Sequence, residues 1–202
     1  TGHRLNQHDI EQFKGMSNEV AHYRDVEGGE PLWTNSMFGG MPTYQISTKY
    51  EGNLLKKITR FLRFGMGSPA GMFILYLLGF YVMLLCMRIN PRVAIFGALI
   101  FAFSSYFIII LQAGHNSKAA AIGLMAPVIG AFYMAYRYNL KWGILLSALF
   151  MGLQLTSNHF QITYYLGIIL VGFGIAEFVR AFKHANWKRF LTATVGILVA
   201  YF

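Results

Sequence analysis

Two carboxylates near the start of the chain are its first candidates for chemistry. Asp9 and Glu11 lie in the stretch NQHDIEQF, with one residue between them. A carboxylate held at a membrane surface could accept a proton from a hydroxyl group, and the pair could help to bind a divalent metal such as Mg²⁺ or Mn²⁺. Acidic residues are also common in the first turn of a helix, where they interact favourably with its dipole. The residues alone leave these interpretations open.

Polar and basic side chains in two later segments form a second group. In AGHNSK, His115 and Lys118 are one helical turn apart and could contact the same anion. His159, in SNHFQITYY, could reach it from another segment. These side chains could instead be interfacial anchors, and Asn158 and Gln161 could form hydrogen bonds between helices.

The composition indicates that water is not the only solvent of this chain. Of its 202 residues, 55% are hydrophobic and 12% are charged, whereas soluble domains have roughly 25% charged residues. The net charge of +9 comes mostly from bases placed between apolar runs. Such bases reflect membrane topology, so we expect no nucleic-acid partner. The single cysteine, Cys86, lies in an apolar run, which excludes a disulfide within the chain and a cysteine metal site.

The apolar runs have the length of membrane-spanning helices, which need about 20 residues. The sequence therefore predicts an all-α polytopic membrane protein, in which residues 1–68 lie outside the membrane and residues 69–202 form a helix bundle. The expected spans are residues 69–87, 93–111, 119–136, 142–158, 160–179 and an incomplete one at 190–202. The chain has no initiator Met or targeting segment and stops inside its last run. We therefore expect it to be a fragment.

The bases predict how these spans are oriented, because Lys and Arg in short connections stay on the cytoplasmic side. The second and fourth connections carry Lys118 alone, whereas the first, third and fifth carry eight bases. We therefore expect residues 112–118 and 156–161 to lie on the extracytoplasmic side, together with residues 1–68. The eight bases are Arg88, Arg92, Arg137, Lys141, Arg180, Lys183, Lys188 and Arg189.

The first 68 residues contain two stretches with helical periodicity. Residues 7–23 place apolar side chains on one side, and paired glycines and prolines then indicate a structured loop. Residues 54–63 have apolar residues on one face and four bases on the other, as in a helix that lies in the plane of the membrane surface. The alternative is that this second helix simply extends the next span.

Several segments together resemble one family. They are HDIEQFKGM, PLWTNSMFGGMPTYQ (31–45), AGHNSKAAAIGLMAPVI (113–129) and SNHFQITYY (157–165). Over essentially its whole length the chain resembles the YfhO-type bacterial membrane proteins, which are similar to C-type glycosyltransferases. Those multi-span enzymes use a polyprenyl-phosphate-linked sugar as donor and keep a catalytic acid in their first outward loop. The resemblance implies that a span precedes Thr1, that many spans follow Phe202, and that Asp9 occupies the place of that acid.

The function expected from this resemblance is inverting sugar transfer to a glycan or glycolipid acceptor, on the outer face of the bacterial inner membrane. Asp9 would be the general base, and Glu11 would assist it or bind a cation, although the Asp-Ile-Glu order departs from the acid-x-Asp pattern frequent in those enzymes. The alternatives are a transporter or flippase for lipid-linked glycans and a non-catalytic assembly protein. The donor phosphate would be bound by His115, Lys118 and His159, and the sugar or acceptor by Trp33, Asn35, Tyr44, Asn116, Asn158 and Gln161.

Overall fold

The chain folds almost entirely into helices, which confirms the predicted all-α class. The computed structural model describes residues 5–47 and 52–201, and these ranges hold nine α-helices and one pair of two-residue strands. The chain divides into two compact units. Unit 1 contains the residues up to Asn53 and the segment Gln112–His115, and unit 2 contains Leu54–Leu111 and the residues from Asn116 onward. Each unit is described by itself.

Unit 1 begins with the helix that the periodicity predicted. Helix α1 (His8–Glu27) is longer than the predicted 7–23, and it buries Ser17 and Val20. It ends at Gly28, whose N–H donates to the carbonyl of Arg24 and whose φ is 70°. This left-handed conformation suits glycine, which has no Cβ to clash.

A short hairpin follows α1 and forms the predicted structured loop. Strands β1 (Trp33–Thr34) and β2 (Met41–Pro42) are antiparallel and lead into a 3-10 helix, η1 (Thr43–Gln45). The hydroxyl of Thr34 and the N–H of Asn35 both donate to one carboxylate oxygen of Glu19 on α1, at 2.5 and 2.9 Å. These bonds fix the hairpin to the helix.

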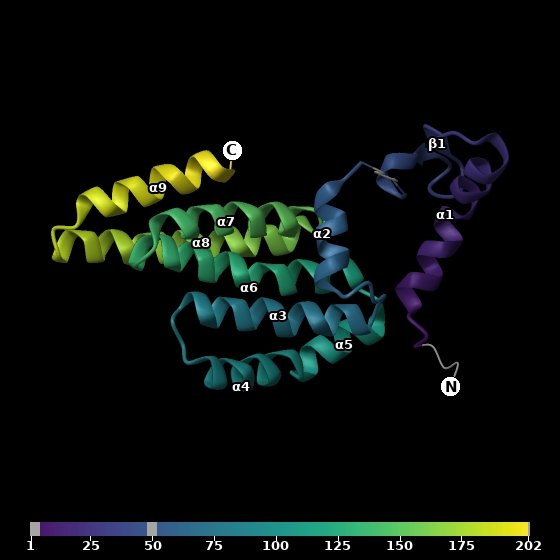
Figure 1. Ribbon diagram of the computed structural model, residues 1–202. Coiled ribbons are helices and arrows are strands. Elements are labelled where there is room, and N and C mark those ends of the chain that lie inside the picture. The colour runs from purple at the N-terminus through teal and green to yellow at the C-terminus, as the bar shows by residue number, and fades with distance from the viewer. Residues whose placement is uncertain (1–4, 48–51, 202) are drawn as a thin grey trace. The chain divides into compact units, whose positions relative to one another are not determined.

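Unit 2 is a bundle in which α6 is the central helix. Helix α6 contacts α3, α7, α8 and α9, and Figure 1 shows α6, α7, α8 and α9 running back and forth along one another. The helices are α2 (Leu54–Leu62), α3 (Ala70–Cys86), α4 (Pro91–Ala102), α5 (Ser105–Ala113), α6 (Asn116–Arg137), α7 (Leu140–Leu155), α8 (Phe160–Lys183) and α9 (Trp187–Tyr201). The last two residues of α5 belong to unit 1.

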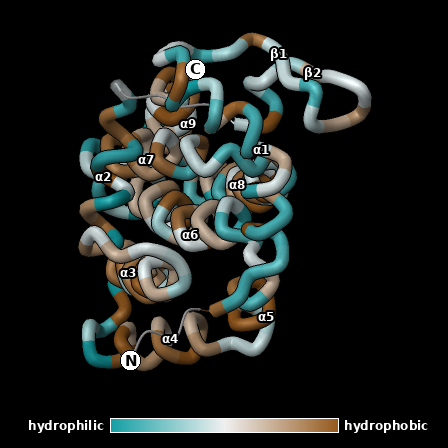
Figure 2. Tube along the Cα trace, turned by 90° about the vertical axis from the view of Figure 1, so that its right-hand side faces the viewer, coloured by the Kyte–Doolittle hydropathy of each residue, from teal (hydrophilic) through white to brown (hydrophobic). Residues whose placement is uncertain are grey.

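The apolar helices of unit 2 indicate membrane association. By length and composition, α6 and α8 can cross a membrane, whereas α3 and α7 are apolar but have 17 and 16 residues. The most apolar window of α6 is 78% buried and that of α8 is 22% buried, so α8 presents most of its apolar surface outward. Figure 2 shows hydrophobic colour along α3, α4 and α5 as well.

The predicted span 93–111 is interrupted in the structure. It consists of α4 and α5, which are bent by 49° relative to each other. The carbonyl of Ser104 accepts from the N–H groups of Phe107 and Ile108, so a new helix starts there. Serine favours the residue before a helix over a helix interior, and this preference explains a break within an uncharged run.

Helices α3 and α6 approach each other closely at glycines. A Cβ at Gly79 would lie 2.0 Å from the carbonyl oxygen of Gly123, so only glycine fits at this contact. Four residues after Gly123, the helix contains Pro127, which has no N–H to donate to that carbonyl. The oxygen of Gly123 therefore faces the backbone of α3, where a weak Cα–H contact can stabilise it.

Helix α2 is separate from the next span, which removes the alternative that it extends that span. Residues 63–69 lie between α2 and α3, and Leu55, Ile58 and Leu62 pack against the core of unit 2. Helix α2 therefore belongs to unit 2, which begins at Leu54, and the boundary of the membrane part at residue 68 stays a prediction.

Candidate functional site

The predicted base Asp9 forms an ion pair with His115 inside unit 1. Oδ2 of Asp9 lies 2.6 Å from Nδ1 of His115, and the two side chains are 40% and 48% exposed. Asp9 is in the first turn of α1, and His115 belongs to the segment that follows α5. Glycine suits the position before His115, because the φ of Gly114 is +96° and a Cβ there would lie 3.0 and 3.3 Å from the Cβ atoms of Gln7 and Asp9, closer than is usual.

Glu11 points to a different partner. Its carboxylate pairs with Lys14 at 2.8 Å, one turn along α1, and both side chains are more than half exposed. An exposed pair of this kind contributes little to stability. Over residues 5–47 and 52–201, no group of three or more His, Cys, Asp or Glu side chains is arranged to hold a metal ion.

The three residues predicted to bind the donor phosphate have separate surroundings. His115 faces Asp9, as described, and the ammonium of Lys118 lies 5.5 Å from the centre of the Tyr106 ring. His159 precedes α8, and its Nδ1 is buried without a hydrogen-bond partner among the residues that the structure describes. A convergence of all three on one anion therefore stays a prediction.

The hairpin residues predicted to bind sugar or acceptor are largely exposed. Trp33 and Tyr44 are 56% and 68% exposed. The Trp33 indole lies over Gly40, where a Cβ would be 2.6 Å from the ring nitrogen and where φ is +124°. Glycine is thus required beneath the ring. The backbone N–H of Asn35 donates to the carboxylate of Glu19, and the side chain of Asn35 is exposed.

The remaining predicted residues lie in unit 2. Asn116 is the first residue of α6, and its side-chain oxygen accepts a hydrogen bond from the hydroxyl of Ser68. The amide of Gln161 donates to the hydroxyl of Tyr165 at 2.9 Å on the exposed side of α8. Asn158, in the connection between α7 and α8, has a φ of 51° and is exposed.

An open cavity of about 600 Å³, lined by polar and apolar residues, lies at the end of unit 2 where α6 begins and α7 ends. Three bases line it, Lys56, Arg60 and Arg63, and we call it the basic cavity. Its wall also contains Asn116, Ser117 and Ser157, and none of its described lining residues is acidic. The sequence predicts these bases on the charged face of a helix at the membrane surface, and among the residues of this wall it predicts only Asn116 as a site residue.

The side chain of Arg63 is partly buried in the wall of the basic cavity. Its Nε is buried and has no hydrogen-bond partner in the described part of the chain. A Cβ at Gly71 would lie 2.7 Å from this nitrogen, so the glycine leaves room for the guanidinium. Burial, followed by the charge of Arg60, lowers the pKa of Arg63 below its ordinary value, because both disfavour the charged form.

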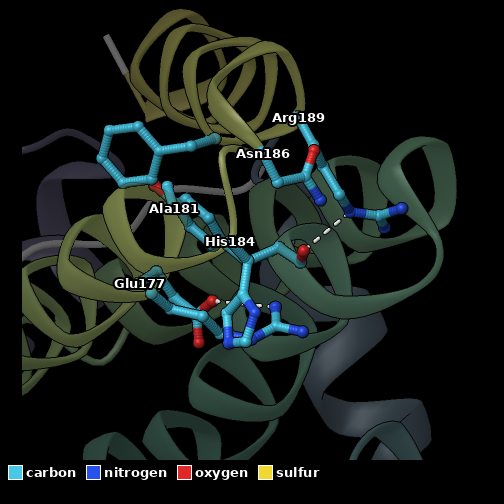
Figure 3. A pocket seen from close by; sticks show the side chains of 8 residues that line it. Glu177, Ala181, His184, Asn186 and Arg189 are labelled. Carbon is cyan, nitrogen blue, oxygen red and sulfur yellow. Dashed lines mark hydrogen bonds and ion pairs between the residues drawn. The ribbon is translucent and has the colours of Figure 1, made fainter.

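A second charged cluster lies where α6 and α8 end (Figure 3), around a cavity of about 30 Å³. Glu177 is 5% exposed and accepts from Nε of Arg137 at 2.7 Å, with Arg180 at 3.6 Å. Nε of Arg189 donates to the carbonyl of Tyr136 at 2.7 Å, near the end of α6. A base suits the negative end of a helix dipole. The cavity has room for about one water, so we assign this cluster a structural role.

Comparison with known proteins adds no identification. No family model, no curated protein and no solved structure matches this chain.

Proposed function

We propose that this chain belongs to a YfhO-type membrane glycosyltransferase. It would transfer a sugar from a polyprenyl-phosphate donor to a glycan or glycolipid acceptor, on the extracytoplasmic side of the bacterial inner membrane. The family rests on the sequence segments quoted above. The single observation that carries the chemistry is the 2.6 Å contact between Asp9 and His115.

The proposed reaction needs a base for the acceptor hydroxyl. The proton of this hydroxyl moves to the Asp9 carboxylate while the acceptor oxygen forms a bond with the anomeric carbon of the sugar. The bond between that carbon and the phosphate oxygen breaks, and its electron pair leaves with the polyprenyl phosphate. His115 holds one carboxylate oxygen of Asp9, which orients the other toward the acceptor. Asp9 is 40% exposed and therefore accessible to a substrate.

Exposed aromatic residues of unit 1 support a carbohydrate partner. Trp33 and Tyr44 combine an apolar ring with a polar atom, and both rings are more than half exposed. Lys118 and His159 stay the proposed contacts of the donor phosphate, with Asn116, Asn158 and Gln161 as further polar contacts. Glu11 would assist Asp9 or bind a divalent cation.

The deciding experiment is a transfer assay with the intact protein purified in detergent. Polyprenyl-phosphate sugars and a lipid or glycan acceptor are added, and the released polyprenyl phosphate is measured by mass spectrometry. We expect release with the native protein and a loss of about 100-fold or more in Asp9→Asn. The matched control is Asp25→Asn, an exposed acid on the same helix. Full activity of a correctly inserted Asp9→Asn protein would contradict the assignment of the base.

The second candidate is a transporter for lipid-linked glycans, which the basic cavity favours. A transporter would bind a lipid phosphate there without breaking a bond, and Asp9 would then be dispensable. It would also use polar groups within the helices, and Gln154 is such a group, fully buried and bonded to Thr163 at 3.1 Å. Transport of a fluorescent lipid-linked sugar across vesicles, with no phosphate released, would favour this candidate.

A further inference from the structure

The basic cavity is built for an anion. Lys56, Arg60 and Arg63 line one space, and no described residue of its wall is acidic. Like charges that share a cavity repel one another, and burial weakens the screening of that repulsion by solvent. The lowered pKa of Arg63, which has burial and then Arg60 as its causes, agrees with this strain. An anion in the cavity would relieve it.

Two further features of the wall favour an oxygen-rich anion. Nε of Arg63 is buried and lacks an acceptor in the described part of the chain, so the guanidinium has a donor still to satisfy. Asn116 and Ser117 begin the 22-residue helix α6. The first N–H groups of a helix have no partner within it and carry a partial positive charge, which suits phosphate. The hydroxyl of Ser157 can donate as well.

The size and position of the cavity indicate a phosphate attached to a larger group. Its volume of about 600 Å³ is in the range of small-molecule sites and exceeds the needs of a bare ion. Two methionines, Met66 and Met72, contribute apolar surface to the wall. On α2, Leu54 and Phe61 are 66% and 77% exposed, which fits a helix in contact with lipid.

From these contacts we infer that the basic cavity binds a phosphate monoester, carried by a lipid headgroup at the membrane surface. Arg60 and Arg63 contact the phosphate oxygens with their guanidinium groups, and Lys56 adds charge. The inference deepens the second candidate function by naming the ligand class and the contacts, and it does not rest on the transferase, because the phosphate binds whether or not a sugar is transferred.

The test measures binding of defined probes to the intact protein in a neutral detergent. Isothermal titration calorimetry compares dioctanoyl phosphatidic acid, inorganic phosphate and the zwitterionic dioctanoyl phosphatidylcholine. We expect phosphatidic acid to bind and phosphatidylcholine not to bind. Competition by inorganic phosphate at similar concentrations would assign the site to free phosphate, whereas binding of phosphatidic acid alone assigns it to a lipid. Either result supports a phosphate site, and no binding of either probe overturns it.

Two matched substitutions on α2 distinguish binding in the cavity from attraction of the anionic lipid by the overall charge of the helix. Arg60→Gln removes a base that lines the cavity, and Lys57→Gln removes an exposed neighbouring base that does not. We expect Arg60→Gln to weaken binding of phosphatidic acid about tenfold, as for one lost charge-assisted contact, and Lys57→Gln to leave it unchanged. Equal losses in both variants would overturn the inference. Because no sugar transfer is involved, this result is independent of the transferase assay.

Discussion

Oδ2 of Asp9 and Nδ1 of His115 are 2.6 Å apart, although Asp9 lies in α1 and His115 follows α5 in the sequence. The contact gives Asp9 a fixed orientation that a solvated helix-start carboxylate lacks. In the proposed reaction His115 therefore positions Asp9, whereas the sequence predicts His115 as a ligand of the donor phosphate.

The first prediction concerns this pair. If His115 acts through Asp9, the variants Asp9→Asn and His115→Ala should not have additive effects on turnover. We expect the double variant to be no slower than Asp9→Asn alone, because the positioning residue has no role once the base is lost. The measurement is the release of polyprenyl phosphate by the three variants. The control is His22→Ala, which removes an exposed histidine from α1, the helix that contains Asp9. Additive losses would indicate that His115 has a separate function, such as phosphate binding.

The second prediction concerns the buried carboxylate of Glu177. Glu177→Gln removes the charge that Arg137 and Arg180 contact at 2.7 and 3.6 Å. We expect the free energy of unfolding to fall by about 2 kcal/mol, as for a lost hydrogen bond between charged groups. Arg180→Gln should cost less, because its contact is longer and more exposed. Thermal unfolding in detergent measures both, and an equal or smaller loss in Glu177→Gln would contradict this account.

The third prediction concerns the approach of α3 to α6. Gly79→Ala places a methyl group 2.0 Å from a backbone oxygen, so one helix must move. We expect a loss of about 2 kcal/mol in the free energy of unfolding, as for overpacking. The matched control is Gly167→Ala on α8, where a Cβ meets nothing within 4 Å. That change should be neutral or slightly stabilising, because alanine favours helix. Equal free energies of unfolding for the two variants would show that α3 and α6 can move apart at Gly79 without loss of stability.

The fourth prediction concerns the crossing of α8. Single cysteines at its two ends, Gln161→Cys and Lys183→Cys, are introduced into a Cys86→Ala background. If α8 spans the membrane with its basic end inside, an impermeant thiol reagent should label position 161 in intact cells with a permeable outer membrane. Position 183 should react only after the inner membrane is opened. Labelling of both ends from outside would show that α8 does not cross, and the reverse pattern would invert the orientation.

Helices could be predicted from the sequence where apolar residues recur at helical spacing or form a long uncharged run. The apolar spacing predicted α1 and α2, and the uncharged runs predicted α3, α6, α7 and α8 to within a few residues. The run 93–111 predicts a span but not its bend, because composition alone has no signal for a bend. The signal was present in the two adjacent serines, Ser104 and Ser105, since the first of them precedes a new helix.

The sites were harder to predict than the helices. A charged face on a helix has the same period whether it meets only water or also lines a cavity, so the spacing of the bases on α2 does not predict the cavity. The cavity depends on the packing of α2, through Leu55 and Ile58, against the core of unit 2, and on the segments around Asn116 and Ser157 that complete its wall. Asp9 and His115 were each named as candidates, but their contact joins segments far apart in the chain, and no local pattern encodes such a contact.

The missing N–H of Pro127 bears on how this sequence can evolve. Its absence leaves the oxygen of Gly123 facing α3, and Gly79 provides the space for it. If position 127 gained an N–H, that oxygen would return to its own helix, and a larger residue at position 79 would become tolerable. Among descendants of this protein, positions 79 and 127 should therefore change together, with proline at 127 confined to chains that keep glycine at 79.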